Sequence, residues 1–196
     1  MKDFTIIRSF YDRRPRLLKI NSKGIVYQNK DLKSNQFTSV NKEEIIGLRY
    51  GIEFIKGYKF YIGRKYLIFV KTQDKKELKI DFKLFYSIKL QEKHNLYCDV
   101  VDSLWENIFS EFTNNLIQKI ISGENVEVAG ILVSDDKIRF NKTEIYLSDL
   151  AIKKYHHYFI LHSKQNQTIN KMLYYLKDDN AVILLEIITD LIKKYE

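Results

Sequence analysis

The chain has 196 residues, of which 45% are hydrophobic and 30% charged, a balance that excludes an intrinsically disordered protein. Its formal net charge is +8, and its one cysteine, Cys98, excludes an intramolecular disulfide and a zinc site made of several cysteines. The first residues become charged too early for a secretory signal, and the strongest apolar run, 181–188, is far shorter than the roughly 20 residues that span a bilayer. We therefore expect a cytoplasmic protein.

The positive charge is concentrated in the first half of the chain. Residues 1–95 contain 22 Lys and Arg against 10 Asp and Glu, whereas residues 96–196 contain 11 against 15. A basic half favours partners that carry phosphate or anionic lipid headgroups. The alternative is that lysine-rich strand faces are only solvated and protect sheet edges from aggregation.

Short runs of β-branched and aromatic residues predict a series of strands in the first half. The expected strands cover residues 4–11, 16–20, 25–27, 37–40, 45–50, 52–62, 66–70 and 77–82. Gly24 closes a turn between the second and third of them, and Gly57 predicts a bulge or a tight hairpin. Residues 29–35 are expected to form a polar loop, and residues 85–95 fit either a strand or a helix.

Apolar residues with helical spacing follow these strands, and a second such segment lies at the end of the chain. An apolar stripe predicts a helix over residues 97–121, ended by Ser122 and Gly123. A second series of strands is expected at residues 126–133, 137–141, 143–147, 150–155, 158–161 and 169–176. Leu184, Ile188 and Leu191 then share one face of a final helix. The order of strands then helix occurs twice, which predicts domains at residues 1–123 and 124–196.

The two series of strands can be aligned as an internal repeat. Residues 18–27 correspond to 132–140, residues 41–46 to 146–152, and residues 66–69 to 158–161. The alignment depends on the order of strands and turns more than on identity. The predicted fold class is α+β, mainly antiparallel β.

This order resembles the pleckstrin-homology (PH)-like fold, in particular bacterial PH-like domains of unknown function. The resemblance lies in the turn at residues 21–25, the segment at residues 43–46 and Asn180 before the final helix. It implies two partly open barrels or curved sheets, each closed by a C-terminal amphipathic helix. It also implies a binding scaffold without catalysis, with ligands that range from phosphoinositides to peptides. We therefore expect an adaptor that binds a protein or peptide partner.

Some PH domains bind phosphoinositides through basic residues on the first hairpin. By this resemblance, the candidate ligand- or partner-binding residues are Arg13, Arg14, Arg16, Lys19 and Lys23. The alternatives are an anionic-lipid or nucleic-acid site in the basic half, and a basic hairpin that is only solvated. For nucleic acid, a stacking platform would use Tyr58, Phe60, Tyr61 and Tyr66, although alternating aromatic residues also fit a core.

The sequence offers few residues for catalysis or metal binding. It has no Gly-x-Ser-x-Gly, no glycine-rich phosphate loop and no His-Glu-x-x-His, so we expect no enzyme, no cofactor and no metal site. Cys98 would be activated if it lay at a helix N-terminus, and a structural thiol is the alternative. His156 and His162 would lie roughly 20 Å apart on a strand, too far to share an ion. Asp99, Asp102 and Glu106 share one helix face, for which solvation is the simpler interpretation.

Overall fold

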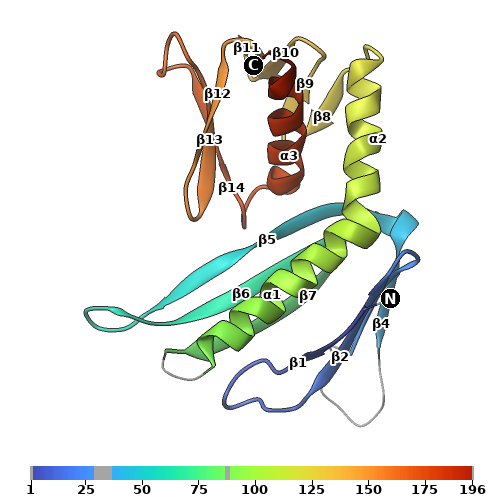
Figure 1. The fold of residues 1–196 in the computed structure, drawn as a ribbon, viewed down its shortest axis with the longest axis vertical. Coiled ribbons are helices and arrows are strands. Elements are labelled where there is room, and N and C mark those ends of the chain that lie inside the picture. Colours follow the sequence, from blue (N-terminus) through green and yellow to red (C-terminus); the bar gives the residue numbers. More distant parts are fainter. Residues whose placement is uncertain (1, 29–36, 87–88, 196) are drawn as a thin grey trace. The chain divides into compact units, whose positions relative to one another are not determined.

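The computed structural model describes residues 2–28, 37–86 and 89–195, which fold into two compact units, Met1–Ser110 and Glu111–Glu196 (Figure 1). The fold class is α+β with antiparallel sheets, one long helix and a C-terminal helix, as the sequence predicts. The described strands form four separate sheets and no closed barrel. The unit boundary lies before the expected position at residue 123, and the expected polar loop at residues 29–35 lies outside the described residues.

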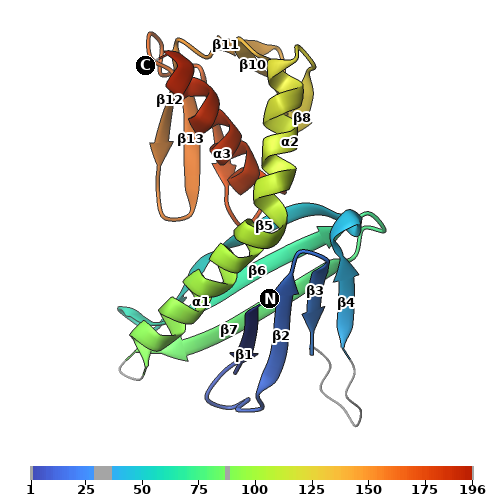
Figure 2. The ribbon, with the colours of Figure 1, turned by 45° about the vertical axis from the view of Figure 1, so that its right-hand side comes forward.

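The first unit contains two antiparallel sheets followed by a helix (Figure 2). The first sheet contains β1 (Lys2–Ile6), β2 (Arg16–Asn21), β3 (Gly24–Tyr27) and β4 (Thr38–Asn41), in that order. The short helix η1 (Lys42–Glu44) leads to the second sheet, which contains β5 (Ile45–Lys56), β6 (Tyr61–Thr72) and β7 (Glu77–Phe85). Helix α1 (Leu90–Leu104) follows, contacts β1, β2 and β7, and continues as a π-helical segment, η2 (Trp105–Phe109).

Local sequence explains the β2–β3 hairpin. The Asn21 side chain accepts hydrogen bonds from the backbone N–H groups of Lys23 and Gly24, at 2.8 and 3.2 Å. Gly24 has a φ of +146°, and a Cβ there would lie 2.1 Å from the carbonyl oxygen of Val40. Only glycine therefore fits this position, because β4 passes directly beside it.

Some strand boundaries differ from the predicted ones. The predicted strand at residues 4–11 ends at Ile6, because a turn begins at Ser9. The predicted break between residues 45–50 and 52–62 is wrong, since one continuous strand, β5, reaches Lys56. Of the two alternatives at Gly57, a bulge or a tight hairpin, the structure has the hairpin. The long helix begins at Leu90, seven residues earlier than predicted.

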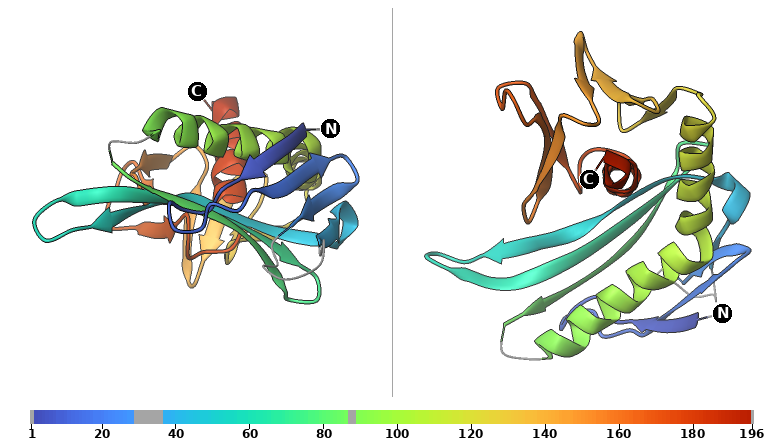
Figure 3. Two further views of the ribbon diagram at one scale, coloured as in Figure 1. Left: turned by 90° about the horizontal axis from the view of Figure 1, so that it is seen from below. Right: turned by 45° about the horizontal axis from the view of Figure 1, so that its top comes forward.

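The two sheets of the first unit meet along the edges of β1 and β7. The backbone N–H of Lys83 in β7 donates a hydrogen bond to the carbonyl oxygen of Arg8, just after β1, at 2.7 Å. We call this contact the seam. Helix α1 contacts β1, β2 and β7 (Figure 3). Its buried Tyr97 ring lies 5.0 Å from that of Tyr66 in β6. The core of the unit thus lies between both sheets and α1.

The second unit starts with α2 (Ser110–Ile121), in which Thr113, Ile117 and Ile120 are buried. One sheet follows with β8 (Val126–Val128), β9 (Ile131–Val133), β10 (Lys137–Phe140) and β11 (Thr143–Tyr146). The other contains β12 (Leu150–Lys154), β13 (Tyr158–Ser163) and β14 (Asn170–Tyr174), before α3 (Ala181–Ile192) and η3 (Lys193–Tyr195). The single strand predicted at residues 126–133 is wrong, since Ala129 and Gly130 both have positive φ and form a turn.

Helix α3 is the most deeply buried element of the second unit. Eight of its twelve residues are buried: Ala181, Val182, Ile183, Leu184, Ile187, Ile188, Leu191 and Ile192. The helix contacts β8, and Asn180 starts it in the left-handed conformation. A helix buried around most of its circumference packs against several neighbours, so its side chains contribute strongly to the core. Within the described residues, no helix has both the length and the hydropathy needed to cross a membrane.

Apart from α2, which precedes the sheets of the second unit, the two units have the same order of sheets and final helix. Each has a four-stranded antiparallel sheet, then a three-stranded antiparallel sheet, then a helix. The segments aligned in the sequence fall on strands of equal rank: β2 and β3 correspond to β9 and β10, and β6 corresponds to β13. The second unit is built from shorter strands, with β12 and β13 of 5 and 6 residues against 12 and 12 in β5 and β6.

Shortening the buried side chains of α3 should destabilise the protein. Leu184→Ala or Ile188→Ala removes a fully buried side chain and leaves a cavity, which should lower the free energy of unfolding by about 2–5 kcal/mol. Chemical denaturation measures this change. Glu186→Ala, at an exposed position of the same helix, is the control and should change stability by less than about 0.5 kcal/mol. Equal midpoints for all three variants would contradict a core role for α3.

The position of α2 predicts how the chain can be divided. A fragment of residues 111–196 keeps Ile117 and Ile120, which are buried, and should fold with a cooperative thermal transition. A fragment of residues 124–196 lacks both side chains and should show no such transition. Circular dichroism of the two fragments tests this. A cooperative transition of equal midpoint in the shorter fragment would place the domain boundary at residue 123 after all.

Candidate functional site

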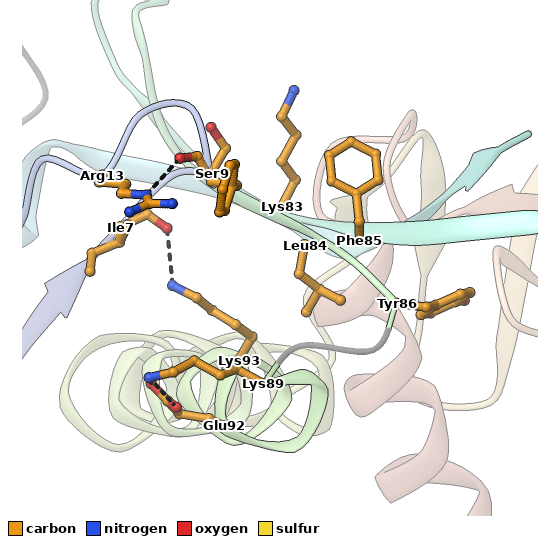
Figure 4. A pocket seen from close by; sticks show the side chains of 11 residues that line it. Ile7, Ser9, Arg13, Lys83, Leu84, Phe85, Tyr86, Lys89, Glu92 and Lys93 are labelled. Atoms are coloured by element: carbon orange, nitrogen blue, oxygen red, sulfur yellow. Dashed lines mark hydrogen bonds and ion pairs between the residues drawn. The ribbon is translucent and has the colours of Figure 1, made fainter.

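An open pocket lies in the first unit, where β1, β7 and α1 come together (Figure 4). Its volume is about 510 Å³. Three segments supply its lining: the chain after β1, the end of β7 and the first turns of α1. The lining residues are Ile7, Ser9, Phe10, Arg13, Lys83, Leu84, Phe85, Tyr86, Lys89, Glu92 and Lys93.

The pocket exists because β1 and β7 separate beyond the seam. After Arg8, the chain turns sharply: Ser9 and Asp12 are joined by a backbone hydrogen bond of 3.2 Å, and the Ser9 hydroxyl accepts a second from the Asp12 N–H at 3.0 Å. Strand β7 continues straight to Phe85. The space between the turn and the end of β7 is therefore left open as a pocket.

Helix α1 closes one side of this space. The ammonium group of Lys93 donates a hydrogen bond to the carbonyl oxygen of Ile7 at 3.0 Å, which ties the helix to the end of β1. Burial lowers the pKa of Lys93, and the nearby Glu92 carboxylate opposes this effect only in part. Lys89 forms an ion pair with Glu92 at 2.9 Å. Of the two lysines at the start of α1, Lys93 is thus structural, and Lys89, the residue before the helix, already has a partner.

The outer wall combines aromatic rings with cations. The Arg13 guanidinium lies 4.1 Å from the centre of the Phe10 ring, and its Nε donates to the Phe10 carbonyl oxygen at 3.0 Å. Both contacts hold Arg13 at the pocket opening while Phe10 stays 60% exposed. Among the described residues, neither Arg13 nor Lys83 forms an ion pair with a carboxylate.

This arrangement suits a ligand that carries both an apolar group and a negative charge. Ile7, Leu84, Phe85 and Tyr86 offer apolar surface, and Arg13 offers a planar guanidinium that can hold a carboxylate or phosphate bidentately. The volume lies within the range of about 300–1,000 Å³ that is typical of ligand pockets. The one carboxylate of the lining, Glu92, is occupied by Lys89.

The five basic residues predicted from sequence lie in different places. Arg13 and Arg14 belong to the β1–β2 loop, and Arg13 lines the pocket. Arg16 is 1% exposed and pairs with Asp12 at 2.9 Å. Lys19 lies opposite Asp3 in the β1–β2 pairing, 3.6 Å from its carboxylate. Lys23 lies in the turn at the opposite end of β2, so the structure does not bring the five together.

Sequence reasoning missed most of the pocket. Lys83, Phe85, Lys89 and Lys93 lie 70 to 80 residues beyond Arg13, and no local pattern indicates that β7 meets the chain after β1. The burial of Arg16 did have a signal. It alternates with Leu18 and Ile20, so a period of two places its side chain on the inward face of β2.

The other candidate groups are not arranged for chemistry. Cys98 is the ninth residue of α1, 3.8 Å from the His94 ring, and burial raises the pKa of its thiol, which opposes activation. Glu106 pairs with Lys2 at 3.0 Å. Tyr66, expected in a stacking platform, is fully buried. In the described parts of the chain, no cluster of three or more His, Cys, Asp or Glu could hold a metal ion.

Compared with known proteins, the chain matches no family model, no curated protein and no solved structure. The interpretation of the pocket therefore depends on its own geometry.

The ion pair between Arg16 and Asp12 should hold the loop that forms the pocket wall. Arg16→Ala removes a buried side chain and the hydrogen bonds to Asp12, so it should lower the free energy of unfolding by about 1.5–3 kcal/mol. Urea denaturation measures this loss. Lys23→Ala, at an exposed turn, should change stability by less than about 0.5 kcal/mol. Equal effects of both substitutions would contradict a structural role for Arg16.

Proposed function

We propose that the protein is a non-catalytic interaction module of two PH-like units, and that the pocket of the first unit binds a peptide segment of a protein partner. The segment would place an apolar or aromatic side chain inside the pocket and an Asp or Glu beside Arg13. One observation supports this most directly: an apolar cavity of about 510 Å³ opens next to Arg13 and Lys83, two cations without a carboxylate partner among the described residues.

The PH-like assignment is supported by the element order. Each unit has four strands, then three strands, then a helix that packs on the sheets, and this is the order that the resemblance implies. In the first unit the seam brings the edges of the two sheets together under α1, as expected for a partly open barrel. Loops at the open end of such a scaffold are free to vary, which makes them suitable for binding.

A nucleic-acid site is less well supported. A stacking platform needs several rings on one accessible sheet face. Tyr66 is instead fully buried between Phe82 and Tyr97, at ring distances of 5.1 and 5.0 Å. Tyr66 therefore belongs to the core. Without it, the exposed rings of the predicted platform do not form a continuous row along the strand.

Selection from a random peptide library against the full chain tests the proposal. Enriched sequences should combine a large apolar residue with Asp or Glu within a few positions. In fluorescence anisotropy, Arg13→Glu with Lys83→Glu should weaken a selected peptide at least about tenfold, because two attractive charges become repulsive. Lys23→Glu changes a charge at the other end of β2 and should leave the affinity unchanged.

A second pair of variants tests whether the apolar wall of the pocket contributes to peptide affinity. Phe85→Ala removes a wall residue that is 37% exposed, and Phe37→Ala removes a ring of similar exposure, 41%, outside the pocket. Only the first should weaken the peptide. A library without enrichment, or selected peptides that bind the Arg13→Glu, Lys83→Glu variant as tightly as the unchanged protein, would contradict the proposed function.

A further inference from the structure

The tip of the β5–β6 hairpin exposes three aromatic rings. Tyr58 is 92% exposed, Phe60 70% and Tyr61 57%. Exposed turns are usually made of Gly, Asn, Asp, Ser or Pro, whose backbones turn easily and whose side chains are readily hydrated. Large rings at such a turn carry a hydration cost in the free protein. We call residues 56–61 the aromatic tip.

A backbone hydrogen bond closes the turn of the aromatic tip. The backbone N–H of Gly57 donates to the carbonyl oxygen of Phe60 at 2.8 Å and closes a short loop. A Cβ at Gly57 would lie 2.7 Å from the Ile62 side chain, so glycine permits this close turn. β7 ends opposite Gly63, and the tip continues beyond it as a free projection of the unit (Figure 1). The rings are therefore presented on a firm, convex end.

The distal hairpin is also basic. Residues 51–66 contain Lys56, Lys59, Arg64 and Lys65 against one acidic residue, Glu53. Glu53 lies 3.6 Å from the Lys65 ammonium, so its charge is already balanced. Lys59 lies 5.7 Å from the Tyr58 ring, and Lys56 forms no ion pair with any described residue. Positive charge thus flanks the rings at the tip.

We propose that the aromatic tip docks the protein peripherally on an anionic lipid bilayer. Tyr and Phe rings favour the boundary between headgroups and acyl chains, where their apolar faces leave water. The lysine stems can follow the rings inward while their ammonium groups stay among anionic headgroups. Lys56 precedes the rings and Lys59 lies between Tyr58 and Phe60, so the same end of the hairpin offers both apolar faces and positive charge to such a surface.

The shape of the tip favours a bilayer over a nucleic acid. A single strand is bound in a groove, along which successive bases stack on rings. The tip is convex, and its rings lie around a turn rather than along one strand face. Phe54, 5.3 Å from the Tyr61 ring, is covered by the Arg64 guanidinium at 5.6 Å, which further limits stacking on the hairpin below the tip.

Flotation of the full chain with vesicles tests the proposal. The vesicles contain phosphatidylcholine alone or with about 30% phosphatidylglycerol, and only the anionic ones should bind. Each lysine near an anionic surface contributes about fivefold to partitioning, so Lys56→Gln with Lys59→Gln should lower it about 30-fold. Tyr58→Ser with Phe60→Ser should lower it about tenfold or more, while thermal stability stays unchanged because both side chains are exposed.

The second unit supplies matched controls. Its equivalent turn, between β12 and β13, is closed by a hydrogen bond from Tyr155 N–H to the Tyr158 carbonyl oxygen at 2.9 Å. Lys153 and Lys154 precede it and are exposed. Lys153→Gln with Lys154→Gln removes the same charge as the tip variant, and Tyr155→Ser removes a ring. Both control variants should float with anionic vesicles as the unchanged protein does.

Tryptophan fluorescence tests directly whether the aromatic tip enters the bilayer. Phe60→Trp adds a reporter to the single native Trp105, and its emission should shift to shorter wavelength with anionic vesicles only. No vesicle binding, equal losses in the tip and control variants, or an unshifted emission would each overturn the proposal. Tip-dependent binding of a single-stranded oligonucleotide in place of vesicles would overturn it in favour of a nucleic-acid surface.

Discussion

The first unit depends on one long-range backbone contact, the hydrogen bond from Lys83 N–H to the Arg8 carbonyl oxygen. Two sheets that were not linked at an edge would leave a row of unpaired backbone groups along β1 and β7. The seam satisfies one such pair, and α1 contacts β1, β2 and β7 in the same unit.

The pocket follows from the way this contact ends. Beyond Arg8 the chain is held in the turn from Ser9 to Asp12, and the ion pair of Asp12 with Arg16 fixes that turn against β2. Lys93 then bridges the gap to Ile7. Partial burial disfavours the charged ammonium and so lowers the pKa of Lys93, and the hydrogen bond to the Ile7 carbonyl oxygen offsets part of the cost of burying this charge. The opening is therefore framed by structural contacts, and Arg13 and Lys83 remain at its edge.

How far the sequence predicts this structure depends on the range of the interactions. Local patterns predicted the Gly24 turn, the strand at residues 77–82 and the apolar face of α3, because each is determined within about ten residues. The seam joins residues 75 positions apart, and nothing in either segment specifies its partner. The basic residues near the first hairpin were therefore grouped by sequence proximity, whereas in the structure only Arg13 of these five lines the pocket. A charged residue inside an apolar alternation, such as Arg16, is better interpreted as structural.

The second unit shows which features of the first are additions to a shared plan. Both units close the equivalent hairpin with the same backbone hydrogen bond, from Gly57 to Phe60 and from Tyr155 to Tyr158. In the second unit the strands are half as long or less, and the turn carries His156 and His157 in place of Tyr58 and Lys59. The first unit contains 22 Lys and Arg against 13 Asp and Glu, whereas the second contains 11 against 12. Strand length and exposed rings thus increase together at one hairpin, which belongs to the more basic unit. The shared element order requires neither, so their coincidence is better explained by binding than by folding.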